Sequence, residues 1–444
     1  MAEIRKVAVI GAGVMGAGIA AHIANAGVPV VLLDIVPQGA NDHSTIARGA
    51  VAKMLKTNPA PFMHKRNARL IETGNLEDDL GSLADCDWIC EAIIENPQIK
   101  RDLYKRLNEV RKPGSIVTSN TSTIPLNVLT EGLGEDFAGD FAITHFFNPP
   151  RYMRLLEVVK GAKTRDDAFA ALKQFGDVKL GKEVVDCKDT PGFIGNRIGC
   201  FLMLSGLHKA KAARAEGLSQ ETIDALISAP VGLPPTGLYG LIDLIGLDVM
   251  YLVGRNLATN LPADDTGHAF TSFPEAEQRM FDTRQLGRKS GGGFYRMIKD
   301  AEGNRSKEVF DLDTGNWRAE SPATLTESQR AAETLMFEDS VEGRFAWDLM
   351  GGTLSYAADL VPQISDDVVN IDRAMRWGFA WRKGPFEFLD QLGPRRVIER
   401  LQAEGKPLPA MLQVLADAGA ESFYLAEGSE YLGLDGAWHA TPPE

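Results

Sequence analysis

The most constraining feature of the sequence is a glycine-rich turn close to the start of the chain. Gly11, Gly13 and Gly16 form the pattern GxGxxG between a continuous apolar run, Val7 to Ile10, and a helix-like segment that begins at Val14. The first glycine permits a tight turn, the second lets the backbone approach a diphosphate, and the third allows close packing of helix on strand. The chain is therefore expected to begin with a dinucleotide-binding strand–helix–strand unit.

An acidic residue after the second apolar run indicates which dinucleotide is bound. Asp34 closes the run Val30 to Leu33, about twenty residues after the glycines, where a ribose-binding acid is expected. Its carboxylate can accept hydrogen bonds from ribose hydroxyls and would repel a 2′-phosphate, which favours NAD over NADP. Val14 and Met15 open a helix whose free N–H groups would face the diphosphate, so we include both with the glycines as cofactor-binding residues.

Strand-like and helix-like segments alternate in the first part of the chain, and the pattern becomes helical after Asp189-Thr190-Pro191-Gly192. Such alternation predicts an α/β Rossmann-like doubly wound sheet, here followed by duplicated all-α domains. The expected divisions are a Rossmann domain over 1–187, a first helical domain over 188–296, a linker with one hairpin over 297–328, a second helical domain over 329–425 and a tail over 426–444.

The two helical blocks resemble each other in sequence. The segment from Thr236 to Asp243 is similar to the segment from Lys383 to Asp390, and Ile223-Asp224 pairs with Ile371-Asp372 at nearly the same spacing. Several matches at one spacing indicate a duplicated domain. The alternative is that both blocks are generic helical segments.

The composition excludes several classes of protein. The formal net charge of -13 argues against a nucleic-acid partner, which would need a basic face. Cys86, Cys90, Cys187 and Cys200 include no CxxC pair, so free thiols in a reducing compartment are expected, and we predict no metal site. No apolar stretch reaches transmembrane length, and the run after Lys6 leaves no room for a signal-peptide core, so a cytoplasmic enzyme is expected.

Three polar clusters follow predicted strands or open the helical part, where open α/β sheets bind their ligands. They are Ser119 to Ser122, Thr144 to Pro149 and Asp189 to Arg197. Together with the glycine turn, Glu91 to Asn96 and Lys289 to Tyr295, these segments closely resemble the L-3-hydroxyacyl-CoA dehydrogenase family over essentially the whole chain.

The similarity is greatest to the dehydrogenase portion of bacterial multifunctional fatty-acid β-oxidation enzymes, in which a crotonase-fold hydratase follows. The chain stops about where that hydratase would begin, and two alternatives stay open: a truncated multifunctional enzyme and a naturally separate dehydrogenase. The resemblance implies reversible, NAD-dependent oxidation of an (S)-3-hydroxyacyl-CoA to the 3-ketoacyl-CoA. It also implies an acyl-CoA thioester as substrate, with an enoyl-CoA hydratase and a thiolase as candidate partners. Because a duplicated block could replace the homodimer of single-copy relatives, a monomer or weak homodimer is expected.

The resemblance makes His145 the catalytic base and Glu157 its partner. The chemistry agrees, because oxidation of a secondary alcohol requires removal of the hydroxyl proton, which histidine can accept near neutral pH. A carboxylate such as Glu157 in an apolar strand is costly unless it is paired. Ser122 and Asn196 match family residues at the substrate hydroxyl and the thioester carbonyl. Their structural alternatives are a turn residue and a helix cap.

Other family positions carry charged or polar side chains. Glu95 and Lys100 match positions near the NAD ribose and phosphates, Lys289 matches a lysine at the cofactor, and Asn148 is expected to position the substrate or the nicotinamide end. For each charged residue of this group, the alternative is an ordinary solvated charge.

One departure from the family pattern concerns coenzyme A. The family often places a lysine for the CoA phosphates on the long helix after the second strand, but the aligned position here is Met54. Lys53 and Lys56 lie beside it, and we predict that they contact the substrate.

The sequence argues against two other functions. Dehydrogenases of the 3-hydroxyisobutyrate type rely on a catalytic lysine from the helical side, and the segment His145 to Pro149 argues against this class. A non-catalytic role, like that of lens crystallins that resemble the family, is disfavoured because His145, Glu157 and Asn196 are all present.

Overall fold

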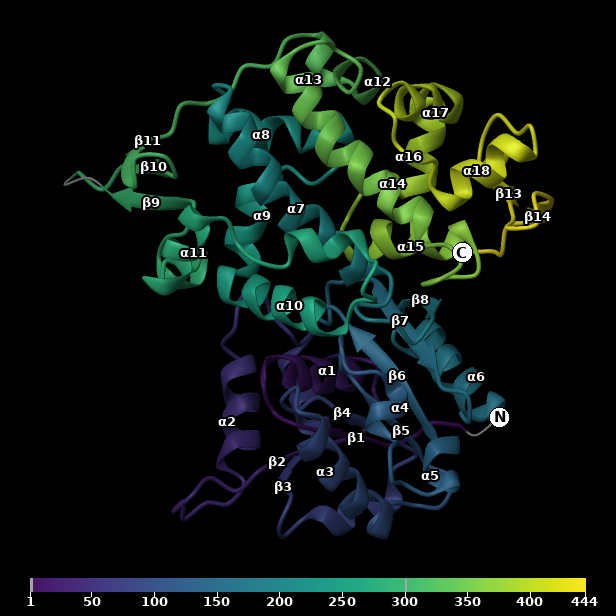
Figure 1. Ribbon diagram of the computed structural model, residues 1–444. Coiled ribbons are helices and arrows are strands. Elements are labelled where there is room, and N and C mark those ends of the chain that lie inside the picture. The colour runs from purple at the N-terminus through teal and green to yellow at the C-terminus, as the bar shows by residue number, and fades with distance from the viewer. Residues whose placement is uncertain (1–2, 300–301) are drawn as a thin grey trace. The chain divides into compact units, whose positions relative to one another are not determined.

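The apolar runs of the N-terminal part form an eight-stranded sheet in the computed structural model, which describes residues 3–299 and 302–444 (Figure 1). The strand order is β3-β2-β1-β4-β5-β6-β7-β8, and neighbouring strands are parallel except for the antiparallel pair β6–β7. This order confirms the predicted doubly wound sheet. The strands are β1 (Val7–Ile10), β2 (Val30–Asp34), β3 (Ile71–Asn75), β4 (Trp88–Glu91), β5 (Ile116–Ser119), β6 (Phe141–Phe146), β7 (Leu155–Lys160) and β8 (Glu183–Cys187).

Helices connect these strands and cover the sheet. Asn96 caps α3, because its side chain accepts hydrogen bonds from the backbone N–H groups of Gln98 and Ile99 at 3.0 and 3.1 Å, and Pro97 occupies the first helical position. The helices of this part are α1 (Val14–Asn25), α2 (Thr45–Met54), α3 (Pro97–Val110), α4 (Leu126–Leu129), α5 (Glu135–Gly139) and α6 (Asp166–Gln174).

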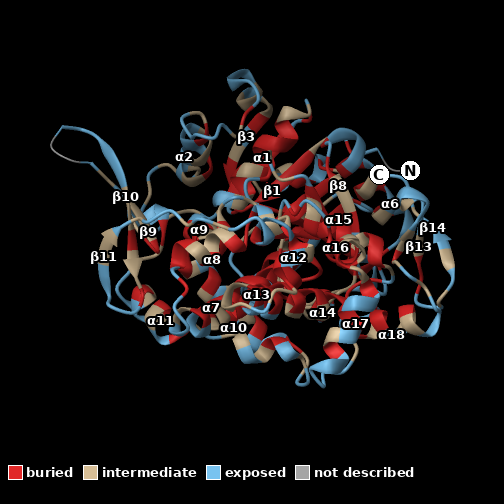
Figure 2. Cartoon of the chain, turned by 90° about the horizontal axis from the view of Figure 1, so that it is seen from above, coloured by how far each residue is buried: buried red, intermediate tan, exposed pale blue. Residues whose placement is uncertain are grey.

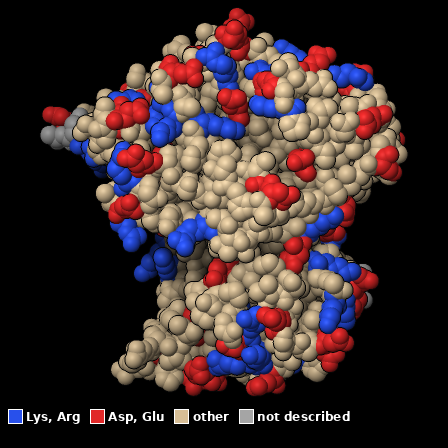
Figure 3. All heavy atoms as spheres, viewed as in Figure 1, with Lys and Arg blue, Asp and Glu red and all other residues tan. Residues whose placement is uncertain are grey.

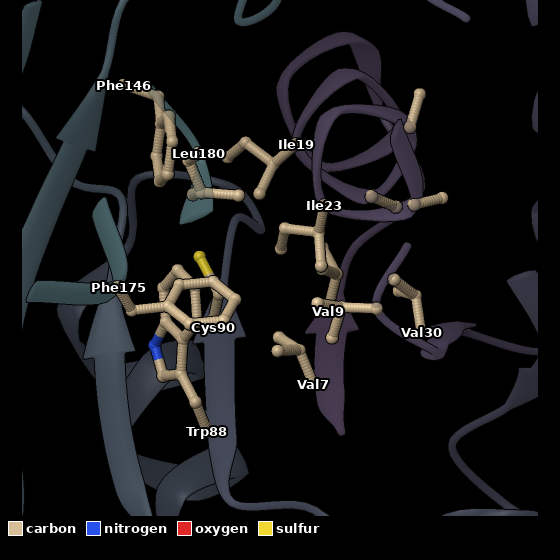
Figure 4. Packing of buried hydrophobic residues seen from close by; sticks show 14 of the residues in the cluster. Val7, Val9, Ile19, Ile23, Val30, Trp88, Cys90, Phe146, Phe175 and Leu180 are labelled. Carbon is tan, nitrogen blue, oxygen red and sulfur yellow. The ribbon is translucent and has the colours of Figure 1, made fainter. Parts of the chain in front are cut away.

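The core of this part lies between the sheet and α1 (Figure 4). Val9 of β1 and the α1 residues Ile19 and Ile23 are fully buried, and Trp88 of β4 meets Phe175 edge to face with ring centroids 5.6 Å apart. Burying one such aliphatic side chain contributes about 1.5–3 kcal/mol. The continuous apolar strands are thus accounted for by burial on both faces.

The chain divides into two compact units, the first ending at Phe193 and the second running from Ile194 to Pro443. The segment after β8 belongs with the first unit, since the Gly192 N–H donates to the Ser122 carbonyl at 3.2 Å. The second unit contains α7 (Gly195–Ala215), α8 (Gln220–Leu226), α9 (Gly237–Ile245), α10 (Leu247–Asn260), α11 (Glu275–Asp282), α12 (Ala332–Leu335), α13 (Val341–Ala346), α14 (Gly352–Asp359), α15 (Val368–Gly378), α16 (Pro385–Leu392), α17 (Pro394–Ala403) and α18 (Ala410–Asp417).

Helix α7 is the centre of the second unit and contacts helices of both predicted copies, α9 and α10 as well as α13, α14 and α15. Small residues permit this packing. A Cβ atom at Gly199 would lie 2.2 Å from the Phe379 ring, and one at Gly206 would lie 2.8 Å from Leu238. Within the second unit, buried residues lie along α7 and along α12 to α16 (Figure 2). The two helical blocks therefore share one core.

Two small antiparallel sheets modify the expected all-α second part. The first is β11-β10-β9, formed by β9 (Tyr295–Lys299), β10 (Arg305–Asp311) and β11 (Asn316–Ala319). The region 297–328 was expected to hold one hairpin, but it contributes to three strands because the first begins before residue 297. The expected tail, 426–444, contains two strands of the second sheet. That sheet consists of β12 (Tyr424–Leu425), β13 (Glu430–Leu432) and β14 (Trp438–Ala440).

One set of hydrogen bonds occurs twice in the second unit. Asp224 of α8 accepts two backbone N–H groups from the first turn of α9, at 2.7 and 3.2 Å, and the Tyr295 hydroxyl at 2.8 Å. Asp372 of α15 likewise accepts two N–H groups from the first turn of α16, at 2.8 and 3.1 Å, and the Tyr424 hydroxyl at 2.7 Å. This shared arrangement supports the proposal that the helical block is duplicated.

Candidate functional site

The glycine turn joins β1 to α1 and is packed tightly against the end of β4. Gly11 has a φ of +100°, and a Cβ atom there would lie 2.6 Å from the Ala92 carbonyl oxygen. A Cβ atom at Gly16 would lie 1.8 Å from the Gly11 carbonyl oxygen, whereas one at Gly13 would meet nothing within 4 Å. The turn is therefore closed on its inner side and open at Gly13, the N-cap residue of α1, where free N–H groups can meet a diphosphate.

Asp34 lies beside this turn. One carboxylate oxygen accepts the Ala12 N–H at 2.6 Å and the other accepts the Ile35 N–H at 2.6 Å, so each oxygen keeps a lone pair for a ribose hydroxyl. Met15 is partly buried against the core, and its expected contribution is a backbone N–H. The donor and acceptor set at the open turn fits a dinucleotide without a 2′-phosphate.

Exposed apolar side chains flank the same strand ends. Val14 is 70% exposed, Ile35 after β2 is 60% exposed, and Ile94 after β4 is 64% exposed. Large aliphatic side chains at such positions can cover the faces of a planar base. The sequence patterns assigned no role to either isoleucine: Ile35 directly follows β2, and Ile94 lies three residues after β4 in the family-like segment Glu91 to Asn96.

His145 and Glu157 are brought together by the antiparallel strand pair β6–β7. His145 on β6 is directly opposite Glu157 on β7, and Nδ1 of the ring lies 2.7 Å from Oε2 of the carboxylate. The side chains are 8% and 0% exposed. Phe147 and Phe193 enclose the ring, with centroids 4.6 and 5.6 Å from that of the imidazole. With Nδ1 held by a carboxylate, Nε2 is the nitrogen left to exchange a proton.

Ser122 follows the end of β5 and is tied to Glu95. Oε1 of Glu95 accepts the Ser122 backbone N–H at 3.1 Å and the Thr121 hydroxyl at 2.9 Å. Asn120, which the sequence patterns did not single out, accepts the backbone N–H of Phe146 at 2.9 Å and so joins the end of β5 to the end of β6. Asn148 is exposed in the loop after β6. The polar clusters of the first unit thus lie along the carboxyl ends of its central strands.

Lys100 lies behind Glu95 and is not presented to solvent. Its side chain is 1% exposed, and Nζ lies 2.7 Å from Glu91 and 3.3 Å from Glu95. The geometry therefore gives the ammonium of Lys100 an indirect place at the site, through Glu95. The sequence predicted no role for Glu91, although it is the first residue of the segment Glu91 to Asn96 that carries the family resemblance.

Lys53 and Lys56 are exposed on and just after α2, while Met54 is buried in the core. They belong to a segment, residues 43–71, with six Lys or Arg and no Asp or Glu. On the face of the molecule in Figure 3, by contrast, acidic and basic side chains are interspersed. The segment is locally basic in a chain whose net charge is -13.

Two expected site residues belong to the second unit. Asn196 is the second residue of α7 and is half-buried, next to the fully buried Arg197, whose Nε donates to the Tyr356 hydroxyl at 2.6 Å. Lys289 is half-exposed and forms an ion pair with Asp248.

Among the described residues, no single helix is long and apolar enough to cross a membrane, and α9 and α10 pass such a test only together, across a 91° bend.

Comparisons with known proteins give a consistent family. A family model described as "3-hydroxyacyl-CoA dehydrogenase, NAD binding domain" matches residues 6–190, and one described as "3-hydroxyacyl-CoA dehydrogenase, C-terminal domain" matches residues 192–297. A Deinococcus radiodurans protein named as a 3-hydroxyacyl-CoA dehydrogenase is 43% identical, over 67% of this chain and 84% of that protein.

Longer relatives match almost the whole chain. A Rickettsia felis protein named as a fatty acid oxidation complex trifunctional enzyme is 38% identical over 92% of this chain. This chain spans 56% of that protein, and about half the length of the other curated relatives of this kind. The crystal structure of 3-hydroxybutyryl-CoA dehydrogenase from Escherichia coli K12 superposes with a TM-score of 0.70 at 24% identity, covering 94% of this chain and all of that one, which establishes similarity of fold.

Proposed function

Because the chain belongs to the 3-hydroxyacyl-CoA dehydrogenase family of NAD-dependent oxidoreductases, we propose that it reversibly oxidises (S)-3-hydroxyacyl-CoA thioesters to 3-ketoacyl-CoA. The observation that carries this proposal is the buried pair His145–Glu157, with 2.7 Å between Nδ1 and Oε2, at the end of β6 in a sheet that also holds the dinucleotide turn. An imidazole so held is suited to take a proton from an alcohol.

His145 acts as the base for the substrate hydroxyl. Glu157 accepts a hydrogen bond from the Nδ1–H group, which keeps the ring proton on Nδ1 and leaves Nε2 free to accept the hydroxyl proton. The carboxylate then stabilises the imidazolium that forms, and it does so strongly because both groups are shielded from water. In the reverse direction the imidazolium returns its proton to the ketone oxygen. NAD, when bound, supplies the hydride acceptor.

The remaining residues orient the two ligands. Gly11, Gly13 and Gly16 form the diphosphate turn and Asp34 holds the adenosine ribose. Glu95 lies toward the cofactor, and its carboxylate sets the backbone of the Ser122 loop.

Ser122 is proposed to donate a hydrogen bond to the reacting oxygen, because its half-buried hydroxyl has no partner among the described residues. Asn196 is proposed to contact the thioester carbonyl, Lys289 the cofactor, and Asn148 the nicotinamide end or the substrate.

Coenzyme A carries several phosphate charges, and the exposed Lys53 and Lys56 are proposed to contact them. Both lysines lie in the basic segment 43–71, whose local positive charge offsets the repulsion that a chain of net charge -13 exerts on an anion. A free hydroxy acid would gain little from these lysines, so they favour a CoA thioester as substrate.

A hydratase that forms 3-hydroxyacyl-CoA and a thiolase that cleaves 3-ketoacyl-CoA are the proposed neighbours in the reaction sequence. Supporting this, a relative of which this chain spans 56% bears the name of a trifunctional fatty acid oxidation enzyme. The second helical block is proposed to pack where a homodimer partner would, giving a monomer or weak homodimer.

The test is NADH oxidation with acetoacetyl-CoA as substrate. His145→Gln is expected to lower kcat by about 100- to 10,000-fold while NADH binding is retained. The matched control is His439→Gln, since His439 also lies beside an acid, 2.9 Å from Asp435, but at the exposed surface. Wild-type turnover in the His145 variant, or equal losses in both variants, would contradict the proposal.

A further inference from the structure

Glu91 is a fully buried carboxylate with four hydrogen-bond donors. Oε1 accepts from Lys100 Nζ and from the Ile93 backbone N–H, both at 2.7 Å. Oε2 accepts from the Tyr104 hydroxyl at 2.5 Å and from the Ser119 hydroxyl at 2.7 Å. Burial and the charge of Glu91 raise the pKa of Tyr104 well above its usual value, so the phenol remains a donor. All the donors converge on one carboxylate at the carboxyl end of β4.

Lys100 is shared between two acids, and the sharing is unequal. Its ammonium lies 2.7 Å from Glu91 and 3.3 Å from Glu95, and it also lies 3.4 Å from the Ser119 hydroxyl. The ammonium contacts Oε2 of Glu95, while Oε1 of the same carboxylate accepts the Ser122 N–H at 3.1 Å. Without the negative charge of Glu91, the nearest anion for Lys100 is Glu95.

Glu91 also shapes the wall beneath the dinucleotide turn. Its carboxylate accepts the Ile93 N–H two residues after the end of β4, which holds the backbone on either side of Ala92. The Ala92 carbonyl and the Ile93 side chain are the nearest groups to Gly11, at 2.6 and 3.2 Å from the position of a Cβ atom there. One buried carboxylate therefore contacts both the support of the cofactor turn and the ion pair behind the Ser122 loop.

We propose that Glu91 is a positioning residue for the dehydrogenase reaction: it sets the Ser122 loop through Lys100 and Glu95, and it sets the Gly11 turn through Ile93. This inference rests on the proposed function for Ser122, whereas its cofactor half depends only on NADH binding. Glu91 itself is proposed to touch neither the cofactor nor the thioester, since its side chain is fully buried.

The test compares Glu91→Gln with a control at the opposite edge of the same sheet. Asp140 precedes β6 at its amino end, is 5% exposed, and accepts hydrogen bonds from Arg111 at 2.7 Å and from Arg165 at 2.7 and 3.0 Å. Asp140→Asn therefore also removes the charge of a buried carboxylate that is hydrogen-bonded to basic side chains. Asp140, however, lies at the amino end of β6, far from the carboxyl ends of the strands near His145. For each variant, the thermal midpoint, NADH affinity by fluorescence titration, and kcat and KM with acetoacetyl-CoA are measured.

Glu91→Gln is expected to lower kcat on the order of 100-fold with little change in the KM for the thioester, because Ser122 is displaced while the CoA contacts are kept. The Kd for NADH is expected to rise about tenfold, the effect of losing one hydrogen bond to a charged group behind the turn. Asp140→Asn is expected to lower the thermal midpoint without either effect.

Other outcomes separate the two proposals. If wild type fails to turn over acetoacetyl-CoA while Glu91→Gln still weakens NADH binding, the proposed substrate is wrong and the role of Glu91 at the cofactor turn stands. If Glu91→Gln lowers the thermal midpoint as Asp140→Asn does, yet keeps wild-type kcat and NADH affinity, Glu91 is structural only. Should Glu91→Gln not fold, Ser119→Ala removes one donor to Glu91 and one contact of Lys100, and unchanged kcat and Kd in that variant would overturn the inference.

Discussion

Replacing Glu157 by glutamine tests the proposed role of the pair His145–Glu157 most directly. Glutamine keeps the size of the side chain and its place on β7 but removes the negative charge 2.7 Å from Nδ1 of His145. An amide can also donate to Nδ1, which would place the ring proton on Nε2, the nitrogen that must accept the substrate proton. The variant therefore loses both the stabilisation of the imidazolium and the preference for the productive tautomer.

The size of the effect follows from the geometry. A hydrogen bond to a charged group contributes about 1.5–3 kcal/mol. Two opposite charges 2.7 Å apart in a medium of effective dielectric constant 20 attract by roughly 6 kcal/mol, which is an upper figure for the imidazolium. We therefore expect kcat to fall by about 100- to 10,000-fold, which corresponds to about 3–5 kcal/mol. Stability should change less, since a neutral amide avoids the cost of burying a charge.

The assay is steady-state turnover of acetoacetyl-CoA, with NADH affinity and the thermal midpoint measured on the same preparation. Losing a hydrogen bond to a charged group costs at least about 1.5 kcal/mol, or roughly tenfold in rate. A kcat within about threefold of wild type would therefore refute the role given to Glu157. A large fall in NADH affinity would also refute it, because the pair would then be acting on the cofactor turn. The expected pattern is a loss confined to kcat.

Three further predictions concern the turn, the basic segment and a buried histidine. Gly16→Ala should abolish NADH binding and lower the thermal midpoint, because its methyl group would lie 1.8 Å from a carbonyl oxygen, whereas Gly13→Ala should weaken NADH binding with no loss of stability, since it meets nothing within 4 Å. Lys53→Ala combined with Lys56→Ala should raise the KM for acetoacetyl-CoA and flatten its dependence on salt, while the NADH Kd stays at the wild-type value. Burial first, and the nearby Lys182 second, lower the pKa of His22 from 6.5 to about 4. The folded chain therefore keeps His22 neutral where the unfolded chain protonates it, and the free energy of unfolding should fall by about 3 kcal/mol as pH decreases from about 6.5 to 4. The free energy of unfolding of His22→Gln, measured with urea, should lack this pH dependence. If wild type and His22→Gln give the same pH profile, His22 does not contribute.

Local patterns determined a large part of this protein. The GxGxxG turn, the buried strand before it and Asp34 after the next strand are read within a few residues of one another, because the turn geometry and the nucleotide contacts are themselves local. The structure confirms the doubly wound sheet that this motif predicts. The resemblance also identified the family, which the comparisons show.

Several features depended on contacts between distant segments. In the sequence, Glu91 is an acid at the end of a strand and the first residue of a family-like segment, neither of which predicts a role for it. Its burial with Lys100, Tyr104 and Ser119 follows from the packing of α3 and β5 against β4. Of the short strands β9 to β14, the sequence predicted only one hairpin in the region 297–328. The other strands were not predicted, since they are brief, partly exposed and lack regular alternation. In each of the two small sheets, neighbouring strands pair antiparallel, because the chain turns back on itself between them.

The sequence by itself determined the nucleotide turn, the class of sheet and the presence of a histidine and an acid suited to proton transfer. Only the tertiary structure decided that His145 and Glu157 face each other, because that requires β7 to run antiparallel to β6 in one register; a shift by one residue would turn the carboxylate to the other face of the sheet. It also decided that Lys100 is buried behind Glu95. In both cases, segments far apart in the sequence pack together and exclude water from charged side chains that contact each other. No local pattern of residues encodes such packing.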